Sequence, residues 1–198
     1  RDIKKICNIV HDSDALYARV VVDNSNWSCY NYNPFDDGAD VVVESLGKYC
    51  CGHGDAMGGV ILNCDCTPAI SVFGTGIDPF SAWLIARGLS TMPIRMQQSM
   101  KSAKVVYDFL KNDLHIECVN KCAAVMTFLL PGNHSFDQLD KILKKASLIS
   151  REYSFGQENT SWMIENVTGK NHIRISVGLE NVNDIVNDIN NTIGEYCA

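Results

Sequence analysis

DVVVESLGKYCCGHGDAMGG, the sequence of residues 40–59, combines a short apolar run with a polar, glycine-rich segment. Three β-branched residues, Val41 to Val43, predict a buried strand, and the residues after them carry the chain out of the sheet. Lys48 is therefore expected at the carboxyl end of a strand. In open α/β sheets ligands bind at this edge, and a lysine held there can act as an amine nucleophile.

A second apolar run lies upstream, in the segment RVVVDN at residues 19–24, and it ends in an acid. The residues between Asp23 and Lys48 are numerous enough for a crossover connection, which predicts two neighbouring parallel strands. Such strands bring one carboxylate and one amine to the same pocket. This pair suits pyridoxal phosphate (PLP), because the cofactor needs a lysine for its Schiff base and an acid that keeps its pyridine nitrogen protonated.

The residues around this pair form a longer pattern. It consists of Asp23-Asn24-Ser25, Gly38-Ala39-Asp40 and Ser45-x-x-Lys48-Tyr49-x-x-Gly52-His53-x-Asp55-x-x-Gly58-Gly59. The pattern resembles the cofactor-lysine signature of the Cys/Met metabolism family of PLP-dependent enzymes. Two later blocks, DPFSAWLIARGLSTMPIRM at residues 78–96 and RISVGLE at residues 174–180, are similar to segments of the same family in the same order.

The resemblance implies an α/β fold, that of the fold-type I PLP-dependent transferases. Residues 1–93 are expected to form the later strands of the large mixed sheet in the PLP-binding domain. Residues 94–112 are expected to form a bridging helix, and residues 113–198 a small C-terminal α+β domain. The match covers most of this chain but begins partway through a family chain, so the chain is expected to be a fragment of a longer enzyme.

Hydrophobic periodicity predicts the individual elements. Helices are expected at residues 2–12, 80–87, 94–111, 136–143 and 182–193, and strands at residues 60–63, 125–130 and 172–177. The final helix turns Ile185 and Ile189 inward, which leaves Asp184 and Asp188 on its solvent side. The polar residues 150–171 are expected to form a loop.

The resemblance implies roles for four side chains at the cofactor. Lys48 would hold PLP and move protons on the substrate, while Asp23 would pair with the pyridinium nitrogen. Ser25 and Ser45 resemble hydroxyl residues that line the cofactor, with Ser45 at its phosphate. The alternatives for these positions are a solvated lysine, an aspartate that caps a turn, and small polar residues at strand ends.

Two further side chains resemble residues that bind the substrate. Arg174 would hold the α-carboxylate with both prongs of its guanidinium group, a geometry that lysine cannot copy. An arginine inside an otherwise apolar strand needs a partner, which favours a function for it. Ser147 resembles a residue close to the same carboxylate. His53 and Asp55 are expected to be structural, as hydrogen-bonding partners within their own loop.

The chain also departs from the family pattern. Gly47 stands where the family has a second hydroxyl residue before the lysine, so one phosphate contact is lost. Ile149 and Ser150 replace two glycines, and the stretches at residues 110–122 and 150–172 are shorter than in the family. These departures motivate an alternative, a catalytically inactive relative that acts as an interaction partner.

The reaction class implied by the resemblance is trans-sulfuration. A PLP-dependent carbon–sulfur lyase or γ-synthase would break or make the γ C–S bond of cystathionine, methionine or activated homoserine. The expected partners are the amino-acid substrate and either further copies of the chain, as a dimer or tetramer, or a complementary N-terminal half.

Composition argues against several other classes of protein. A net charge of −6, with no basic cluster, argues against a nucleic-acid-binding surface. No apolar run is long enough to span a bilayer and no signal peptide precedes the first helix, so a cytosolic location is expected. The nine cysteines fit no common zinc spacing, which favours free thiols and no metal. A metal site of Cys64, Cys66 and His53 is the alternative.

Overall fold

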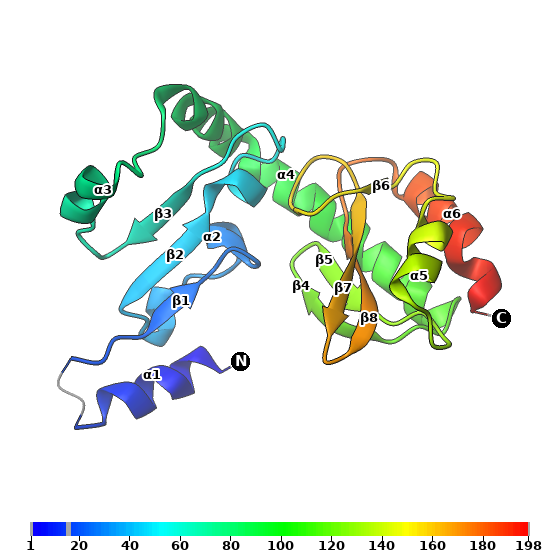
Figure 1. Ribbon diagram of the computed structural model, residues 1–198, viewed down its shortest axis with the longest axis horizontal. Helices are drawn as coiled ribbons and strands as arrows, with labels where there is room; N and C mark the ends of the chain where they lie inside the picture. The colour runs from blue at the N-terminus through cyan, green and yellow to red at the C-terminus, as the bar shows by residue number, and fades with distance from the viewer. Residues whose placement is uncertain (1, 15–16, 198) are drawn as a thin grey trace. The chain divides into compact units, whose positions relative to one another are not determined.

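The computed structural model describes residues 2–14 and 17–197, which divide into two compact units with the boundary between Met92 and Pro93. Figure 1 shows the elements of each unit along the chain. The long helix α4 (Pro79–Asn112) contributes residues to both units.

The first unit contains a three-stranded sheet in the order β1-β2-β3. Its strands are β1 (Val21–Asp23), β2 (Val41–Ser45) and β3 (Gly59–Leu62). β1 and β2 are parallel, with Asp23 beside Val43, and β3 runs antiparallel to β2. The predicted parallel pair is confirmed, and it places the carboxyl ends of β1 and β2 at one edge of the sheet.

Helix α1 (Ile3–His11) packs on this sheet through a small core. Asp2 caps the helix, because its side chain accepts a hydrogen bond from the backbone N–H of Lys5 at 3.0 Å. Cys7 is buried against Val22 and Val42. Between β1 and β2 lie the short helix α2 (Ser28–Asn31) and a 3-10 turn at Pro34–Asp37.

The chain leaves β2 through a π-helical turn, Leu46–Cys50, and reaches α4 by way of β3 and helix α3 (Thr67–Phe73). Cys51 packs with Leu84 and Ile85 of α4 in a second core. Gly88 makes this approach possible, because a Cβ atom there would overlap the carbonyl oxygens of Cys50 and Cys51. The turn after β2 is therefore fixed against the first half of α4.

The prediction of two separate helices at residues 80–87 and 94–111 is wrong, because α4 continues through Pro93. Proline removes one backbone hydrogen bond and ordinarily ends or kinks a helix. Here Met92 and Met96, on either side of the proline, are both buried, so packing stabilises the continuous helix. Although α4 has 34 residues, no helix in the described part of the chain is long and apolar enough to cross a membrane.

The second unit contains a five-stranded sheet in the order β4-β5-β8-β7-β6. Its strands are β4 (Cys118–Cys122), β5 (Val125–Phe128), β6 (Ser150–Arg151), β7 (Ser161–Val167) and β8 (Lys170–Ser176). β6 pairs with β7 in parallel and the other pairs are antiparallel. The prediction of a loop at residues 150–171 is therefore wrong, because β6 and β7 occupy much of this segment.

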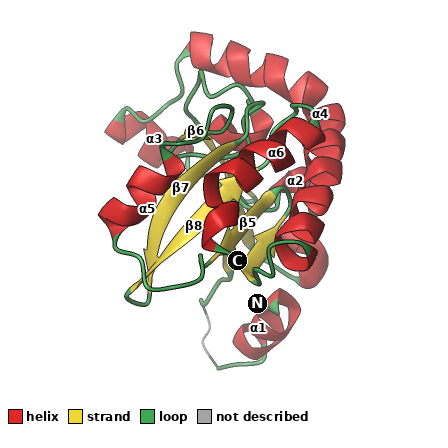
Figure 2. Cartoon of the chain, turned by 90° about the vertical axis from the view of Figure 1, so that its right-hand side faces the viewer, coloured by secondary structure: helices red, strands yellow, loops and turns green. Residues whose placement is uncertain are grey.

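Helices α5 (Phe136–Leu143) and α6 (Val182–Ile193) lie side by side over one face of this sheet (Figures 1 and 2). Ile185, Ile189 and Ile193 of α6 are buried, as the sequence predicts. The placement of Asp188 on the solvent side of α6 is wrong. Its side chain is buried because it accepts hydrogen bonds from the segment at residues 147–149.

Candidate functional site

Lys48 lies just after the carboxyl end of β2, inside the turn Leu46–Cys50. Its backbone is non-helical, with φ −95° and ψ −122°, and the side chain is half-buried. Tyr49 and Cys50, the next two residues, are fully buried and anchor the turn. Lys48 is therefore held on a rigid segment at the position that the sequence predicts.

Asp23 ends the neighbouring strand β1. Its carboxylate accepts a hydrogen bond from the backbone N–H of Ser25 at 2.9 Å. Partial burial, the largest influence, raises the pKa of Asp23, but the Ser25 hydrogen bonds and the positive charge of Lys48 outweigh it and lower the pKa below its ordinary value. Asp23 is thus ionised at neutral pH and is electrostatically coupled to the lysine.

Ser25 and Ser45 connect the ends of the two strands. The hydroxyl oxygen of Ser25, which is buried, accepts a hydrogen bond from the backbone N–H of Ser45 at 2.9 Å. This contact joins the segment after β1 to the last residue of β2. Ser25 therefore has a structural role in addition to any contact with a ligand.

The four side chains predicted at the cofactor all line one cavity of about 730 Å³. This volume is typical of pockets that bind small molecules. The same cavity is lined by Gly58 and Gly59 at the start of β3, and by Thr67 and Thr75 around α3. These residues were not predicted as part of the site. The Thr67-Pro68 pair is typical of the start of a helix and could have placed Thr67 there. This pair does not indicate that Thr67 lines a cavity.

Gly47 has a packing reason to be glycine. A Cβ atom at this position would lie 2.7 Å from the carbonyl oxygen of Ala56, closer than real Cβ contacts allow. The residue that departs from the family pattern is thus matched to the path of the following loop. A hydroxyl side chain cannot be accommodated there unless the backbone at Ala56 moves.

His53 and Asp55 bind within their own loop, as the sequence predicts. The Nδ1 atom of His53 lies 2.7 Å from the carbonyl oxygen of Cys51, and the Cys51 thiol donates to Asp55 at 3.0 Å. Cys64 and Cys66 form a separate pair, with sulfur atoms 3.4 Å apart. In the described residues, His53 is not grouped with these two cysteines, so the alternative metal trio is not assembled.

Arg174 lies on β8 in the second unit, and its partner is supplied by the chain itself. Its guanidinium group pairs with Glu165 of β7 at 2.5 Å and also donates to the carbonyl oxygen of Tyr153 at 3.0 Å. The expectation that this arginine needs a partner is confirmed. A substrate carboxylate at this position would have to replace one of these contacts.

Ser147 also lies in the second unit, before β6. Its backbone N–H and its hydroxyl both donate to the Oδ1 atom of Asp188, at 2.9 and 2.8 Å. The hydroxyl predicted near the substrate carboxylate is thus bonded to a carboxylate of the protein.

Comparison with known proteins gives a consistent result. The model of the family described as Cys/Met metabolism PLP-dependent enzyme matches residues 1–167. The chain is 29% identical to the L-methionine gamma-lyase of Porphyromonas gingivalis, over 95% of the chain and 56% of that enzyme. It is 30% identical to the cystathionine gamma-lyase of Dictyostelium discoideum, over 97% of the chain and 58% of that enzyme.

Solved structures show the same fold. The cystathionine gamma-lyase from yeast superposes on all of this chain with a TM-score of 0.87, at 24% identity and over 61% of its own length. Apo CalE6, a methionine gamma lyase from Micromonospora echinospora, superposes on 98% of the chain and 61% of its own length, with a TM-score of 0.84 and 22% identity. These likenesses confirm the expected fold class.

The chain spans about half the length of the curated relatives it matches. The alignment with the Porphyromonas gingivalis enzyme covers 237 positions, which is more than the 198 residues of the chain. That relative therefore carries segments between the matched residues that this chain lacks.

Proposed function

Because the chain belongs to the Cys/Met metabolism family of PLP-dependent enzymes, we propose that it supplies the lysine-bearing part of an enzyme of sulfur amino-acid metabolism. The reaction would make or break the γ C–S bond of cystathionine, methionine or activated homoserine. One observation carries the proposal: Asp23 ends β1, Lys48 follows the neighbouring parallel strand β2, and both side chains line the same cavity.

The residues present fit PLP at its ring. Lys48 offers an amine on a rigid turn, and Asp23 offers a carboxylate whose low pKa keeps it charged. PLP, when bound, supplies an electron sink that stabilises negative charge on the substrate carbon. Lys48 would hold the cofactor and carry protons at its Nζ atom, and Asp23 would keep the ring nitrogen protonated. Ser45 would lie at the phosphate, with Ser25 beside it.

The proposed substrate residues must exchange partners to act. Arg174 would bind the α-carboxylate in place of its contacts with Glu165 or with the carbonyl oxygen of Tyr153. Ser147 would contact the same carboxylate after its hydroxyl leaves Asp188. The substrate-binding roles of Arg174 and Ser147 are therefore proposals, because both side chains contact the protein itself in this structure.

The relatives are named as enzymes, which favours a catalytic role over that of a non-catalytic interaction partner. We propose an amino-acid substrate and assembly into a homo-oligomer, or with a complementary chain that completes the phosphate site. A cytosolic location also remains a proposal.

Borohydride reduction tests the assignment of Lys48. The protein, together with any complementary chain, is incubated with PLP, reduced and digested, and the labelled peptides are identified by mass spectrometry. We expect the label on Lys48, because its amine lines the same cavity as Asp23, the proposed partner of the ring nitrogen. Lys48→Arg should lose the label, while Lys104→Arg, on an exposed position of α4, should keep it. A label that persists in Lys48→Arg would refute the assignment.

A further inference from the structure

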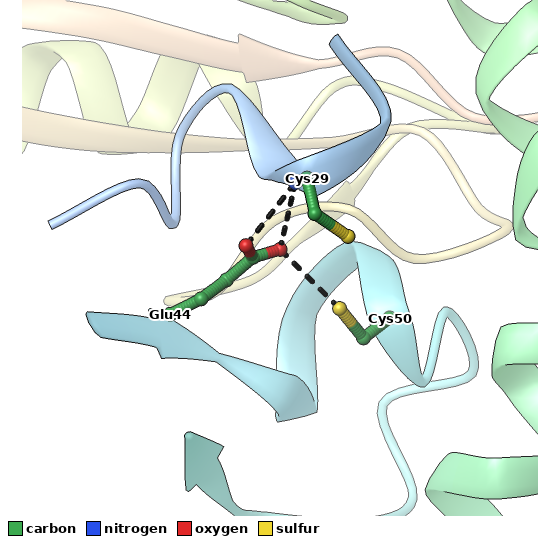
Figure 3. A group of neighbouring side chains, drawn as sticks. All are labelled: Cys29, Glu44 and Cys50. Atoms are coloured by element: carbon green, nitrogen blue, oxygen red, sulfur yellow. Dashed lines mark hydrogen bonds between the residues drawn. The ribbon is translucent and has the colours of Figure 1, made fainter. Parts of the chain in front are cut away.

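Two cysteines and a glutamate meet beside the turn that carries Lys48. Cys29 comes from α2, Glu44 from β2 and Cys50 from the end of the turn, and their sulfur and carboxylate atoms lie within 4.8 Å of one another. Figure 3 shows the three side chains turned toward one another. The proposed function uses none of these side chains, so the cluster raises a separate question.

Glu44 is a buried acid in need of compensation. The Glu44 residue is only 5% exposed and Cys50 is 1% exposed. The carboxylate accepts the backbone N–H of Cys29 at 3.1 and 3.2 Å and the thiol of Cys50 at 3.4 Å. Within residues 2–14 and 17–197, no cationic side chain forms an ion pair with it. A buried carboxylate is costly unless a positive charge or a metal compensates it.

The donor atoms suit a tetrahedral metal. Zinc binds cysteine sulfur at about 2.3 Å and carboxylate oxygen at about 2.1 Å, so sulfur and oxygen ligands of one ion lie roughly 3.6 Å apart. The sulfur of Cys50 lies 3.4 Å from an oxygen of Glu44, close to that separation. Cys29 is exposed, which leaves a route by which an ion can enter.

We propose that Cys29, Glu44 and Cys50 form a binding site for a zinc ion, with a fourth position open to solvent beside Cys29. The two cysteines would bind as thiolates, and with the Glu44 carboxylate they carry three negative charges against the two positive charges of zinc. Zinc accepts such a mixed set of sulfur and oxygen ligands. The ion would join α2, which follows Asp23, to the turn that contains Lys48. This zinc site does not rest on the proposed function, because none of its three ligands has a role there. Its test also involves no cofactor.

Zinc must displace protons from the two thiols. Burial, followed by the nearby Glu44 carboxylate, raises the pKa of Cys50, and the same two causes raise the pKa of Cys29. Binding would release these protons to solvent, because zinc is held by thiolates.

The test is a metal titration of the reduced protein under exclusion of oxygen. Zinc is titrated in competition with a chromophoric chelator, and cobalt is added separately to record its absorption spectrum. We expect one tightly bound zinc per chain and a cobalt spectrum with thiolate charge-transfer bands. Cys29→Ser, Cys50→Ser and Glu44→Gln should each weaken zinc binding by roughly 100-fold or more, because loss of a direct ligand exceeds the loss caused by outer contacts.

Two control variants separate this cluster from other thiols. Cys64→Ser/Cys66→Ser removes a separate pair of thiols, and His53→Asn removes a ligand from the Cys51, His53 and Asp55 group. Both should bind zinc as the wild type does. Circular dichroism checks that each variant is folded. If the buried substitution Cys50→Ser prevents folding, the result with Cys29→Ser decides the test, because Cys29 is exposed and its substitution should not disturb the fold.

Three outcomes would overturn the proposal. One is the absence of stoichiometric binding, and another is binding that is lost in a control variant but kept in Cys29→Ser. The third is a stable disulfide between Cys29 and Cys50 in the native protein, detected by peptide mapping, which would make the pair a redox device instead of a metal site.

Discussion

Asp188 is the buried carboxylate that fixes the segment before β6. Its two oxygens accept the backbone N–H groups of Ser147, Leu148 and Ile149, and Oδ1 also accepts the Ser147 hydroxyl. Burial, the largest influence, raises the pKa of Asp188, but these donors outweigh it and lower the pKa below its ordinary value. A carboxylate in this position stabilises the segment in the way that a capping residue stabilises a helix start.

Asp188→Asn should destabilise the protein by about 2–4 kcal/mol. The amide has one acceptor oxygen instead of two, and its NH2 group would face backbone N–H groups of residues 147–149, which are also donors. The folded-state pKa of Asp188 is lowered, so its stabilisation is present above the unfolded-state pKa and is lost as pH falls through the folded-state value. The variant should therefore lose part of the acid sensitivity of the wild type. Denaturant unfolding at a series of pH values measures both effects.

Asp184→Asn is the control for this prediction, because Asp184 lies on the same helix and is exposed. It should change the free energy of unfolding by no more than about 0.5 kcal/mol. Equal effects of the two substitutions would contradict the role of Asp188.

Asp23→Asn should leave PLP linked to Lys48 but reduce turnover on the order of 100-fold, as for the loss of a preorganised charged group. A neutral amide cannot keep the ring nitrogen protonated, so the ring withdraws electrons less strongly. Absorbance of the bound cofactor and steady-state kinetics measure the two effects separately. Asp14→Asn, at an exposed position, is the control. Unchanged turnover in Asp23→Asn would exclude the proposed role.

The sequence predicts the positions of Lys48 and Asp23 well because Asp23 directly follows one apolar run and Lys48 lies shortly after another, and strand ends are local features. It does not predict the partner of Arg174, because Glu165 lies on β7, a strand that was expected to be a loop. The contacts of Asp188 were missed for a similar reason. Its position on the helix predicts a solvent-exposed side chain. In the structure, a segment distant in sequence lies against it and donates its backbone N–H groups to the carboxylate.

At the scale of elements, the missed strands follow from unusual turns. β4 and β5 are joined by Ala123 and Ala124, and β7 and β8 by Thr168 and Gly169. Thr168 and Gly169 both adopt positive φ, at 52° and 82°, as hairpin turns of two residues often do. Asn-Gly or Asp-Gly would have indicated these turns, whereas Ala-Ala and Thr-Gly are weak signals.

Gly47→Ser tests whether the turn after β2 can accept the hydroxyl side chain that the family pattern has there. The new Cβ atom would lie 2.7 Å from the carbonyl oxygen of Ala56, so the turn or the loop must shift. We expect a loss of about 1–3 kcal/mol in the free energy of unfolding, as for other overpacked sites, and no gain in PLP affinity. Thermal unfolding and PLP titration provide the measurements.

Gly76→Ala is the matched control, because its Cβ atom would meet only Ile70 at 3.8 Å, an ordinary contact. It should leave stability almost unchanged. If Gly47→Ser binds PLP more tightly and unfolds at the same temperature as the wild type, the packing argument is wrong.

At the scale of the whole molecule, the fold class could be predicted because three blocks of sequence resemble the family in the same order, and the superposed structures confirm it. Outside these blocks, hydrophobic periodicity predicts the helices α1, α5 and α6, but the strands β6 and β7 are missed. The L-methionine gamma-lyase of Porphyromonas gingivalis is longer than this chain both within and beyond the matched region.

The first unit has open strand edges and exposed apolar side chains. β1 and β3 are the outer strands of the three-stranded sheet, each paired on one side only among the described residues. Val72 and Phe73 at the end of α3 are 80% and 76% exposed, and Phe80 at the start of α4 is 66% exposed. Exposed strand edges and apolar patches favour association with other chains.

The 198-residue chain expressed alone should therefore self-associate, and light scattering coupled to size exclusion should give a mass above that of one chain. Val72→Ser/Phe73→Ser removes the most exposed apolar side chains of α3 and should lower the associated fraction several-fold. Tyr153→Ser, at a residue 81% exposed in the second unit, should leave it unchanged. A monodisperse monomer that melts cooperatively would contradict the prediction, and it would mean that the open edges of β1 and β3 are tolerated because both strands are short.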